Sequence, residues 1–397
     1  MISAKNTPST APSSTQVPAT ELPLAGVVVV ELGSSIAGPY AARILSDMGA
    51  QVFKVEHPVG GDSSRAWGAR TLNGTTAVYQ CMNRGKRSIT VDMKNAEDVA
   101  QLKRFVVQEV DVVVQNLRPG SAAGFGLGAD ELLALKPSLI YCDQGTFGHA
   151  GPLAHLPGYD PLMQGFSGIA DITGEGASGP SRVGPPLVDL GTGMWSAMGI
   201  LAALHQRNTS GCGGKVQTSL YETALAYMTV HASLYQTTGV APKRDGLRGP
   251  MIAPNGGYEC ADGVLMIVCA TEAQTKRLCD TIEAPHLLDN PNFATTSSRS
   301  QHHDAFAEAL NVVLRHHPRA HWAAKLDAAN IPNAPVHSLP EMMVHEQTLA
   351  TGMLQQAPDG TFTVVALPIQ FDGARRAFDA FAPELGDSDD VLREGSS

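Results

Sequence analysis

Asp189 is the residue of this sequence whose surroundings point most directly to chemistry. It is the one carboxylate in an apolar segment, G-P-P-L-V-D-L-G-T-G-M-W, at residues 184–195. Partial burial destabilises an ionised carboxylate and raises its reactivity, so Asp189 is a candidate nucleophile. The glycines that follow it would let backbone N–H groups approach a substrate oxygen. The alternative is an N-cap acid that only accepts hydrogen bonds from the start of a helix.

Basic side chains gather in the first third of the chain. Residues 1–120 hold 12 Lys+Arg and 10 Asp+Glu, a mild positive excess in a chain whose net charge is −10. Such residues either form a solvated face or bind an anionic small molecule, because Arg and Lys pair with phosphate oxygens. The residues concerned are Arg65, Arg84, Lys86, Arg87, Lys94 and Arg118.

Three familiar catalytic motifs are incomplete here. Glu56 follows Gly38 by 18 residues, where a dinucleotide-binding fold has its ribose-binding acid, but the loop reads G-S-S-I-A-G-P instead of G-x-G-x-x-G. Gly214-Lys215 lacks the first glycine and the Ser/Thr of a P-loop. Ser167, in G-F-S-G-I, lacks the second glycine of a nucleophile elbow. A dehydrogenase, an ATPase and a serine hydrolase are therefore disfavoured.

Histidines and cysteines give no convincing metal or disulfide pattern. Pro318 interrupts the helix that would carry the closest histidine pair, so surface histidines are the better interpretation. The six cysteines include no C-x-x-C and are expected to be buried thiols in a reducing cytoplasm. The histidines are His302, His303, His316, His317 and His321.

Repeated strand–helix–strand units must position these residues. Residues 27–32 (VVVVEL) predict a strand buried on both faces, followed by a loop, a helix over 40–48 and a strand over 51–56. The pattern continues with strands at 88–92, 111–116 and 138–143 and a helix at 96–109. This predicts the fold class as α/β, with an open parallel sheet of Rossmann-like type.

The rest of the chain predicts a second domain and a return to the first. Glycine-rich loops over 145–186 precede helices at 192–206 and 219–237, and a small α/β unit begins near Tyr258. Residues 361–367 have a strand pattern that needs the first domain as a partner. The expected organisation is a flexible tail over 1–22, a large domain over 23–225, linkers and a small domain over 226–335, and a returning segment over 336–397.

Composition excludes several classes of protein. Hydrophobic residues make up 43% of the 397 residues and charged residues 17%, which excludes disorder for most of the chain. The net charge of −10 disfavours nucleic-acid binding. We expect no membrane span, because no apolar run approaches about 18 residues, and no signal peptide, because the N-terminus lacks an apolar core. The expected location is the cytoplasm.

Several motifs together resemble the class III CoA-transferases, the group of formyl-CoA transferase and carnitine CoA-transferase. The similarity runs from about residue 22 to 392 and includes A-G-P-Y-A-A-R-I-L-S-D-M-G-A, N-R-G-K-R-S-I-T-V-D-M-K, P-G-Y-D and V-D-L-G-T-G-M. The resemblance assigns the nucleophile to Asp189. It implies an acyl-aspartyl anhydride, then an aspartyl-CoA thioester, and then the reverse sequence with an acceptor acid.

The resemblance also implies the ligands and the assembly. The substrates would be a CoA thioester and a free carboxylic acid, with no permanently bound cofactor, and the chain would form an interlocked homodimer. His57, Gly124 and Pro157 stand where formyl-CoA transferase has basic side chains, so Arg118 is expected to supply charge from a neighbouring position. The CoA contacts would be Ala37, His57, Val91, Lys94, Asn116, Leu117 and Arg118, with Tyr159 and Leu220 near the acyl end.

Two alternative functions stay open at this point. α-Methylacyl-CoA racemases look similar but use a histidine and an aspartate as an acid/base pair. Tyr159 stands at the place of that histidine and is a poor base near neutral pH, because a tyrosine has an ordinary pKa of about 10. A non-catalytic CoA-binding module would keep the anion site without needing Asp189.

Overall fold

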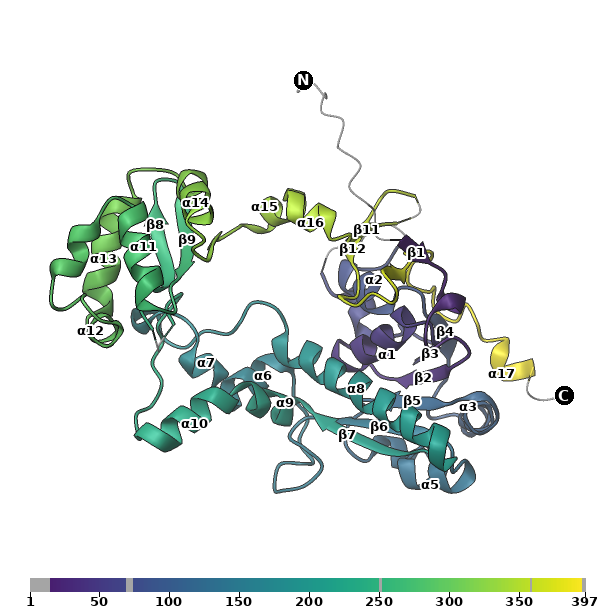
Figure 1. The fold of residues 1–397 in the computed structure, drawn as a ribbon. Coiled ribbons are helices and arrows are strands. Elements are labelled where there is room, and N and C mark those ends of the chain that lie inside the picture. The colour runs from purple at the N-terminus through teal and green to yellow at the C-terminus, as the bar shows by residue number, and fades with distance from the viewer. Residues whose placement is uncertain (1–14, 69–73, 250–251, 358, 395–397) are drawn as a thin grey trace. The chain divides into compact units, whose positions relative to one another are not determined.

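In the computed structural model, which describes residues 15–68, 74–249, 252–357 and 359–394, the chain divides into two units (Figure 1). The larger unit comprises Met1–Ala170, Arg182–Val240 and His345–Ser397, and the smaller one Asp171–Ser181 and Ala241–Val344. The boundary expected from the sequence lies at residue 226. The structure keeps residues up to Val240 with the larger unit, because a helix continues to Thr238.

Six parallel strands form the sheet of the larger unit, in the order β4-β3-β2-β5-β6-β7. The chain moves outward from β2 through β3 to β4, then crosses back to β5, so the connections reverse direction between β2 and β5. Doubly wound sheets bind ligands beyond the carboxyl ends of the strands at such a switch point. The strands are β2 (Val28–Leu32), β3 (Gln51–Glu56), β4 (Arg87–Thr90), β5 (Val112–Gln115), β6 (Ile140–Gly145) and β7 (Gly214–Ser219).

Helices cover both faces of this sheet because its β-branched runs are buried on both sides. Alternate residues of β2 point to opposite faces: Val29 joins the core under α1 and α8, and Val30 joins the core under α3 and α5. In the core under α3 and α5, the ring centroids of Phe53 and Phe105 lie 5.2 Å apart in an edge-to-face arrangement. The helices are α1 (Ala37–Asp47), α2 (Ala77–Asn83), α3 (Ala96–Glu109), α4 (Ser121–Gly124), α5 (Ala129–Leu135), α6 (Asp160–Phe166), α7 (Ile169–Ile172) and α8 (Leu187–Ser210).

The segment after α8 differs from the helix predicted over 219–237. Strand β7 precedes it, with alternating exposure along G-K-V-Q-T-S, and two helices follow, α9 (Leu220–Tyr227) and α10 (Thr229–Thr238). The hydroxyl of Ser219 accepts a hydrogen bond from the backbone N–H of Glu222, at 3.1 Å, and so marks the start of α9. β7 lies at the edge of the sheet, so only half of its residues are buried, and its sequence lacks the continuous apolar run by which the central strands were predicted.

Both chain ends are built into the larger unit. Strand β1 (Thr15–Val17) pairs in parallel with β13 (Ala374–Arg376), and Leu22 is buried. The tail predicted over 1–22 is therefore wrong for residues 15–22, while residues 1–14 lie outside the described chain. At the other end, Ser388 donates its backbone N–H to Ser88 and so covers the edge of β4. The other elements here are α16 (Glu346–Ala350), β11 (Leu354–Gln356), β12 (Thr363–Val365) and α17 (Val391–Glu394).

The smaller unit is an antiparallel sheet with helices and a core of its own. Its strand order is β10-β9-β8, and its core is built around Tyr258, Leu265, Phe306 and Trp322. Its elements are β8 (Asn255–Cys260), β9 (Gly263–Val268), β10 (Asn333–Pro335), α11 (Glu272–Thr281), α12 (Thr296–Gln301), α13 (His303–Leu314), α14 (Arg319–Ala328) and α15 (Leu339–Val344).

Helix α8 is long and apolar enough to cross a membrane, judged by length and composition only. It has 24 residues and a mean hydropathy of 1.4, whereas the sequence was expected to contain no segment long and apolar enough to span a membrane. It packs on α1, β6, β7 and α9, and core helices pass the same test. We therefore describe α8 as the core helix that carries Asp189.

Gly193 lets α8 approach α1 closely, which gives a first prediction. A Cβ added to Gly193 would lie 3.0 Å from the carbonyl oxygen of Ala37 and 3.1 Å from the amide nitrogen of Ala41. Because these atoms are backbone, Gly193→Ala is expected to lower the free energy of unfolding by about 1–3 kcal/mol in urea titrations. Gly165→Ala is the matched control, since open space surrounds that helical glycine; it should raise stability by up to about 1 kcal/mol. Equal effects would contradict the packing argument.

Candidate active site

Asp189 lies in the first turn of α8, as the third residue of the helix. The N-cap is Pro186, so the expectation of an N-cap acid is wrong for Asp189. The side chain that holds the start of α8 is Asp160. Its Oδ2 accepts hydrogen bonds from the backbone N–H groups of Val188, at 2.7 Å, and of Asp189, at 3.2 Å. Asp189 is thus free of the capping role.

Asp160 belongs to the candidate site, although its sequence pattern was not expected to place it there. It is 3% exposed and begins α6, and its Oδ1 accepts a hydrogen bond from Gln164 Nε2 at 2.7 Å. Gln164 in turn accepts one from the backbone N–H of Val183 at 2.8 Å. These bonds fix α6, α8 and the chain before α8 together. An aspartate before a proline at a helix start was the available signal, because both residues favour that position.

The carboxylate of Asp189 is held in an environment that disfavours its charge. Burial raises the pKa of Asp189 to about 7, with the nearby charge of Asp160 adding to the effect. Within the described chain, no hydrogen bond or ion pair reaches the Asp189 carboxylate. An ionised carboxylate without donors is a stronger nucleophile than a solvated one. The geometry therefore suits covalent chemistry near neutral pH.

The glycines after Asp189 serve packing, contrary to the expectation that they expose N–H groups to a substrate. Gly191 and Gly193 lie inside α8, and both are buried. A Cβ on Gly191 would come 1.8 Å from the Tyr227 hydroxyl oxygen. Their small size thus admits α9 on one side and α1 on the other.

Two of the predicted ligand contacts lie in one apolar cluster of the larger unit. Ala37 and Leu220 belong to one buried apolar cluster with Val188, the residue directly before Asp189. Ala37 comes from the start of α1 and Leu220 from the start of α9, so residues far apart in sequence converge here. The apolar cluster is Ala37, Met163, Ile169, Val188, Leu220 and Ala224. Tyr159, in contrast, is 63% exposed.

The other predicted CoA contacts follow neighbouring strands at the carboxyl edge of the sheet. His57 follows β3, Val91 and Lys94 follow β4, and Asn116, Leu117 and Arg118 follow β5. His57, Lys94 and Arg118 are exposed. Val91 is only 1% exposed and packs in the core, so the structure does not present it as a surface contact for CoA.

A cavity of about 540 Å³ lies at this carboxyl edge. Leu117 lines it, together with Gln115 and Asp143 at the ends of β5 and β6. Burial raises the pKa of Asp143, while His149 opposes the rise from 3.6 Å away. The space lies beside β5, one of the two strands at the switch point.

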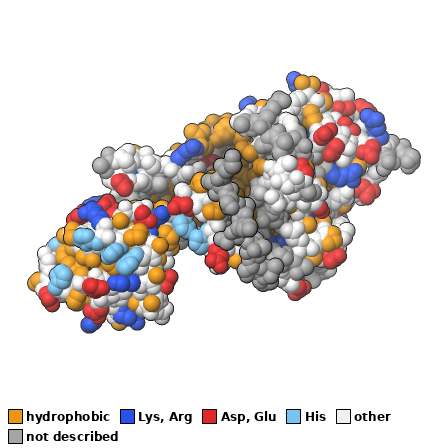
Figure 2. All heavy atoms as spheres, turned by 90° about the horizontal axis from the view of Figure 1, so that it is seen from above, with side chains coloured by type: hydrophobic (Ala, Val, Ile, Leu, Met, Phe, Trp, Pro, Cys, Tyr) orange, Lys and Arg blue, Asp and Glu red, His pale blue; other side chains and the backbone are white. Residues whose placement is uncertain are grey.

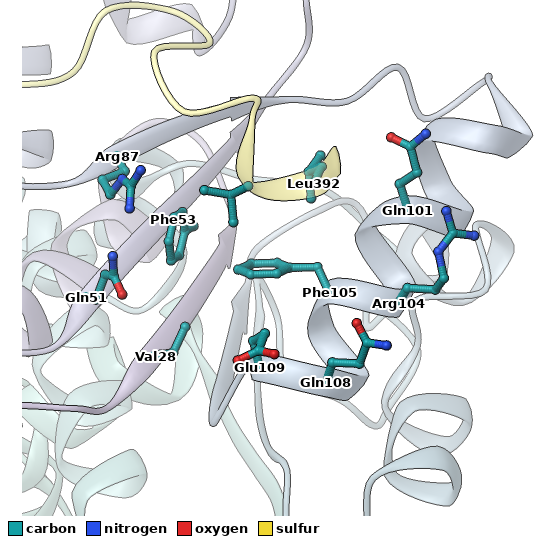
Figure 3. A pocket seen from close by; sticks show the side chains of 11 residues that line it. Val28, Gln51, Phe53, Arg87, Gln101, Arg104, Phe105, Gln108, Glu109 and Leu392 are labelled. Atoms are coloured by element: carbon teal, nitrogen blue, oxygen red, sulfur yellow. The ribbon is translucent and has the colours of Figure 1, made fainter. Parts of the chain in front are cut away.

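A second cavity, of about 400 Å³, lies at the opposite edge of the sheet (Figure 3). The first residues of β2, β3 and β4 line it, and Phe53 and Phe105 face each other inside. Leu392 of α17 closes one side. Of the candidate residues named from the sequence, Arg87 lines this cavity, but Asp189 and the predicted CoA contacts do not, so we do not assign the reaction to it.

Several of the early basic residues are internal ion-pair partners, which corrects both interpretations offered for them. Lys86 and Arg84 are buried, and Lys86 Nζ lies 2.6 Å from Glu31 Oε2. Arg65 forms a two-pronged pair with Glu56, at 2.8 and 2.7 Å. Because Glu56 is occupied in this way, it cannot serve as a ribose-binding acid. Sequence reasoning missed these pairs because their partners are distant along the chain.

The histidine cluster lies in the smaller unit, and Figure 2 shows histidine side chains on its surface. The rings of His317 and His321 stack at 4.1 Å. In the part of the chain that the structure describes, no group of three or more His, Cys, Asp or Glu side chains is placed to hold a metal ion.

Comparison with known proteins assigns the larger part of this chain to one family model. Residues 24–389 match the model described as CoA-transferase family III. The succinate–glutarate CoA-transferase of Agrobacterium fabrum is 34% identical over 94% of this chain and 95% of its own length. The acetyl-CoA:oxalate CoA-transferase of Acetobacter aceti is 33% identical, with the same coverage. The crystal structure of a CAIB/BAIF family protein from Brucella suis superposes with a TM-score of 0.84 and 33% identity, over 94% of this chain and 99% of that one.

Proposed function

Because this chain belongs to CoA-transferase family III, we propose that it moves CoA from an acyl-CoA thioester to a free carboxylic acid through covalent intermediates on Asp189. One observation carries the assignment of the nucleophile. Burial raises the pKa of the Asp189 carboxyl to about 7, with the charge of Asp160 adding to the effect, and Asp189 lies in the first turn of α8, directly after Val188 of the apolar cluster.

Each step of the proposed reaction transfers one acyl or CoA group. An Asp189 oxygen attacks the donor thioester carbonyl, forms a mixed anhydride and expels CoA thiolate. The thiolate then attacks the Asp189 carboxyl carbon, which gives an aspartyl-CoA thioester and releases the donor acid. The acceptor carboxylate attacks that thioester and expels the thiolate, which finally takes the acceptor acyl group from the anhydride. Asp189 is regenerated, and each step is an acyl transfer between groups of similar reactivity.

The carboxyl edge of the sheet is where we place the bound CoA. Its switch point and the cavity lined by Leu117 support this placement. His57, Lys94 and Arg118 are exposed there, and their side chains can reach phosphate groups. The chain has free thiols at all six cysteines, which fits the cytoplasmic location that we also propose.

A transfer assay tests the function directly. The relatives are named for succinate, glutarate, acetyl-CoA and oxalate, so succinyl-CoA and acetyl-CoA with a panel of small dicarboxylic acids form the first screen. The expected result is a new thioester, detected by mass, together with the released donor acid. Proton exchange at the α-carbon in D₂O without any transfer would support the racemase instead. Tight CoA binding without either reaction would support a binding module.

We also propose that the active form is an interlocked homodimer, because α8, α9 and α10 leave large apolar side chains exposed. Trp195 is 43% exposed and Val230 56%. Exposed apolar side chains gathered on helices that contact one another are typical of protein interfaces. The patch is Met194, Trp195, Met198, Leu225, Tyr227, Val230, Leu234 and Tyr235.

Light scattering after gel filtration is expected to give twice the chain mass of 41.7 kDa. The double variant Trp195→Asp/Val230→Asp should shift the mass toward that of one chain, because two charges would be buried in the interface. Val312→Asp, at an exposed valine of the smaller unit outside the patch, is the control. A wild-type chain that elutes as a monomer would contradict the proposal.

A further inference from the structure

Residues 33–39, which run from the end of β2 into the first turn of α1, are held by side chains from other parts of the chain. Asn116 accepts a hydrogen bond from the backbone N–H of Ser34 and donates one to its carbonyl oxygen, both at 3.0 Å. The carboxylate of Asp62 accepts one from the backbone N–H of Ser35 at 3.3 Å. Two separate parts of the chain thus fix the middle of the segment.

Two lysines hold the ends of the same segment. Lys54 Nζ donates to the carbonyl oxygen of Gly33 at 2.9 Å, and Lys86 Nζ donates to that of Pro39 at 2.9 Å. Both side chains are completely buried. A lysine is rarely buried unless its charge is paired. Lys54 and Lys86 are therefore expected to have an acidic partner.

Glu31 supplies that pairing. Its two carboxylate oxygens each lie 2.6 Å from one lysine, Oε1 from Lys54 and Oε2 from Lys86, and Asp62 adds a second contact to Lys54 at 2.8 Å. Buried ion pairs contribute little net stability compared with apolar residues of similar size, because desolvation is costly. Stability alone therefore does not account for four buried charges around one short segment.

The position of the segment explains what the charges are placed to do. Its Ala37 belongs to the apolar cluster beside Asp189, and the Ala37 carbonyl oxygen lies against Gly193 of the same helix. Gly193 lies one helical turn after Asp189, so a shift of residues 33–39 would disturb the packing of the helix that carries the nucleophile. Errors of about 1 Å in a reacting pair can cost about 100-fold in rate.

We propose that Lys54 and Lys86, bridged by Glu31, are positioning residues that fix the β2–α1 segment against the Asp189 helix, so that an acyl-CoA is held in register for attack. This inference rests on the proposed function for its reaction but not for its structural part. The lysines act through the backbone of residues 33–39 and do not contact the substrate.

Lys86→Met tests the proposal, with Arg84→Met as the matched control. Both variants remove a buried cation of the larger unit, but Arg84 pairs with Asp47 at 2.8 Å and contacts no atom of residues 33–39 among its described bonds. Lys54 stays paired to Glu31 in Lys86→Met, which keeps the cluster partly neutralised. Asn116→Ala is a second variant that loosens the same segment without disturbing a buried charge.

Hydrogen exchange measured by mass spectrometry on peptides covering residues 31–41 is the structural readout. Exchange there is expected to rise about tenfold in Lys86→Met and in Asn116→Ala, and to stay at the wild-type rate in Arg84→Met. In the transfer assay, kcat/KM for the acyl-CoA should fall about 10- to 100-fold in Lys86→Met. Asn116→Ala is assessed by hydrogen exchange alone, because Asn116 is itself an expected CoA contact. Arg84→Met should keep the wild-type value at temperatures below its unfolding transition.

The outcomes separate this proposal from the proposed function. Unchanged exchange in Lys86→Met and Asn116→Ala would overturn the positioning role even if activity fell. The same increase in Arg84→Met would also overturn it, because general loosening would then explain the effect. A wild-type chain without transfer activity would instead refute the proposed function, while the exchange data would still decide whether the lysines hold the segment.

Discussion

Asp189→Asn is expected to lower the rate of CoA transfer by about 10⁴-fold or more, because the amide cannot form the anhydride or the aspartyl-CoA thioester. The substitution is nearly isosteric, and the bonds from Asp160 to the start of α8 involve only backbone N–H groups at this position. The helix should therefore keep its geometry. Initial rates with the best donor and acceptor pair measure the effect.

Chemical trapping distinguishes a lost nucleophile from a damaged site. Hydroxylamine or borohydride added during turnover should modify Asp189 in the wild-type chain, since both reagents attack an activated carboxyl group. Peptide mass spectrometry would locate the modification. Asp289→Asn, at an exposed carboxylate of the smaller unit that lines neither of the two cavities described, is the control and should retain both activity and trapping. Transfer by Asp189→Asn at more than about 1% of the wild-type rate would rule out the covalent route.

The sheet was predictable because its signals are local. The run VVVVEL and the strands that follow it are apolar over a few residues, and they need two covering faces wherever they lie. In a parallel sheet, the loops that follow the strands all lie at the carboxyl edge. Residues such as His57 and Asn116, which follow β3 and β5, were therefore correctly expected at the same edge. Asp189 was found in the same way, as one charge in an apolar stretch.

The interior of the site was not predictable because its partners are distant in sequence. From the local sequence alone, Lys86 is expected to be a surface cation, but it pairs with Glu31, which lies 55 residues earlier. From the local sequence alone, Gly193 is expected to provide flexibility, but in the structure it allows the backbone of α1 to pack closely against α8. Asp160 caps α8 from another helix, 28 residues before Val188. In each case a tertiary contact decides between two roles that the local sequence allows equally.

The transfer rate is expected to rise with pH through about 7, because only ionised Asp189 attacks and burial holds the pKa of its carboxyl near that value. Below this pH the rate should fall about tenfold per unit. Asp160→Asn removes the neighbouring charge that helps to raise the pKa, so the acidic limb should move to lower pH. The variant also leaves Gln164 facing an amide group, which should cost about 1 kcal/mol of stability. The control Asp289→Asn should leave the acidic limb of the pH–rate profile unmoved. If the limb is also unmoved in Asp160→Asn, Asp160 does not influence Asp189.

The same pKa predicts how stability depends on pH. Folding raises the pKa of Asp189 from 3.8 to about 7, so the folded state binds the proton more tightly than the unfolded state. The stabilisation from this group is complete below the unfolded value and is lost as the pH rises through about 7. Urea titrations should therefore show that Asp189→Asn is more stable than the wild type at pH 8, by about 1–3 kcal/mol after allowance for solvent screening. On acidification from pH 8 to pH 5, the free energy of unfolding of the variant should rise less than that of the wild type. Parallel curves for the two proteins would mean that Asp189 ionises in the folded chain as freely as in the unfolded one, and the desolvated nucleophile would have to be abandoned.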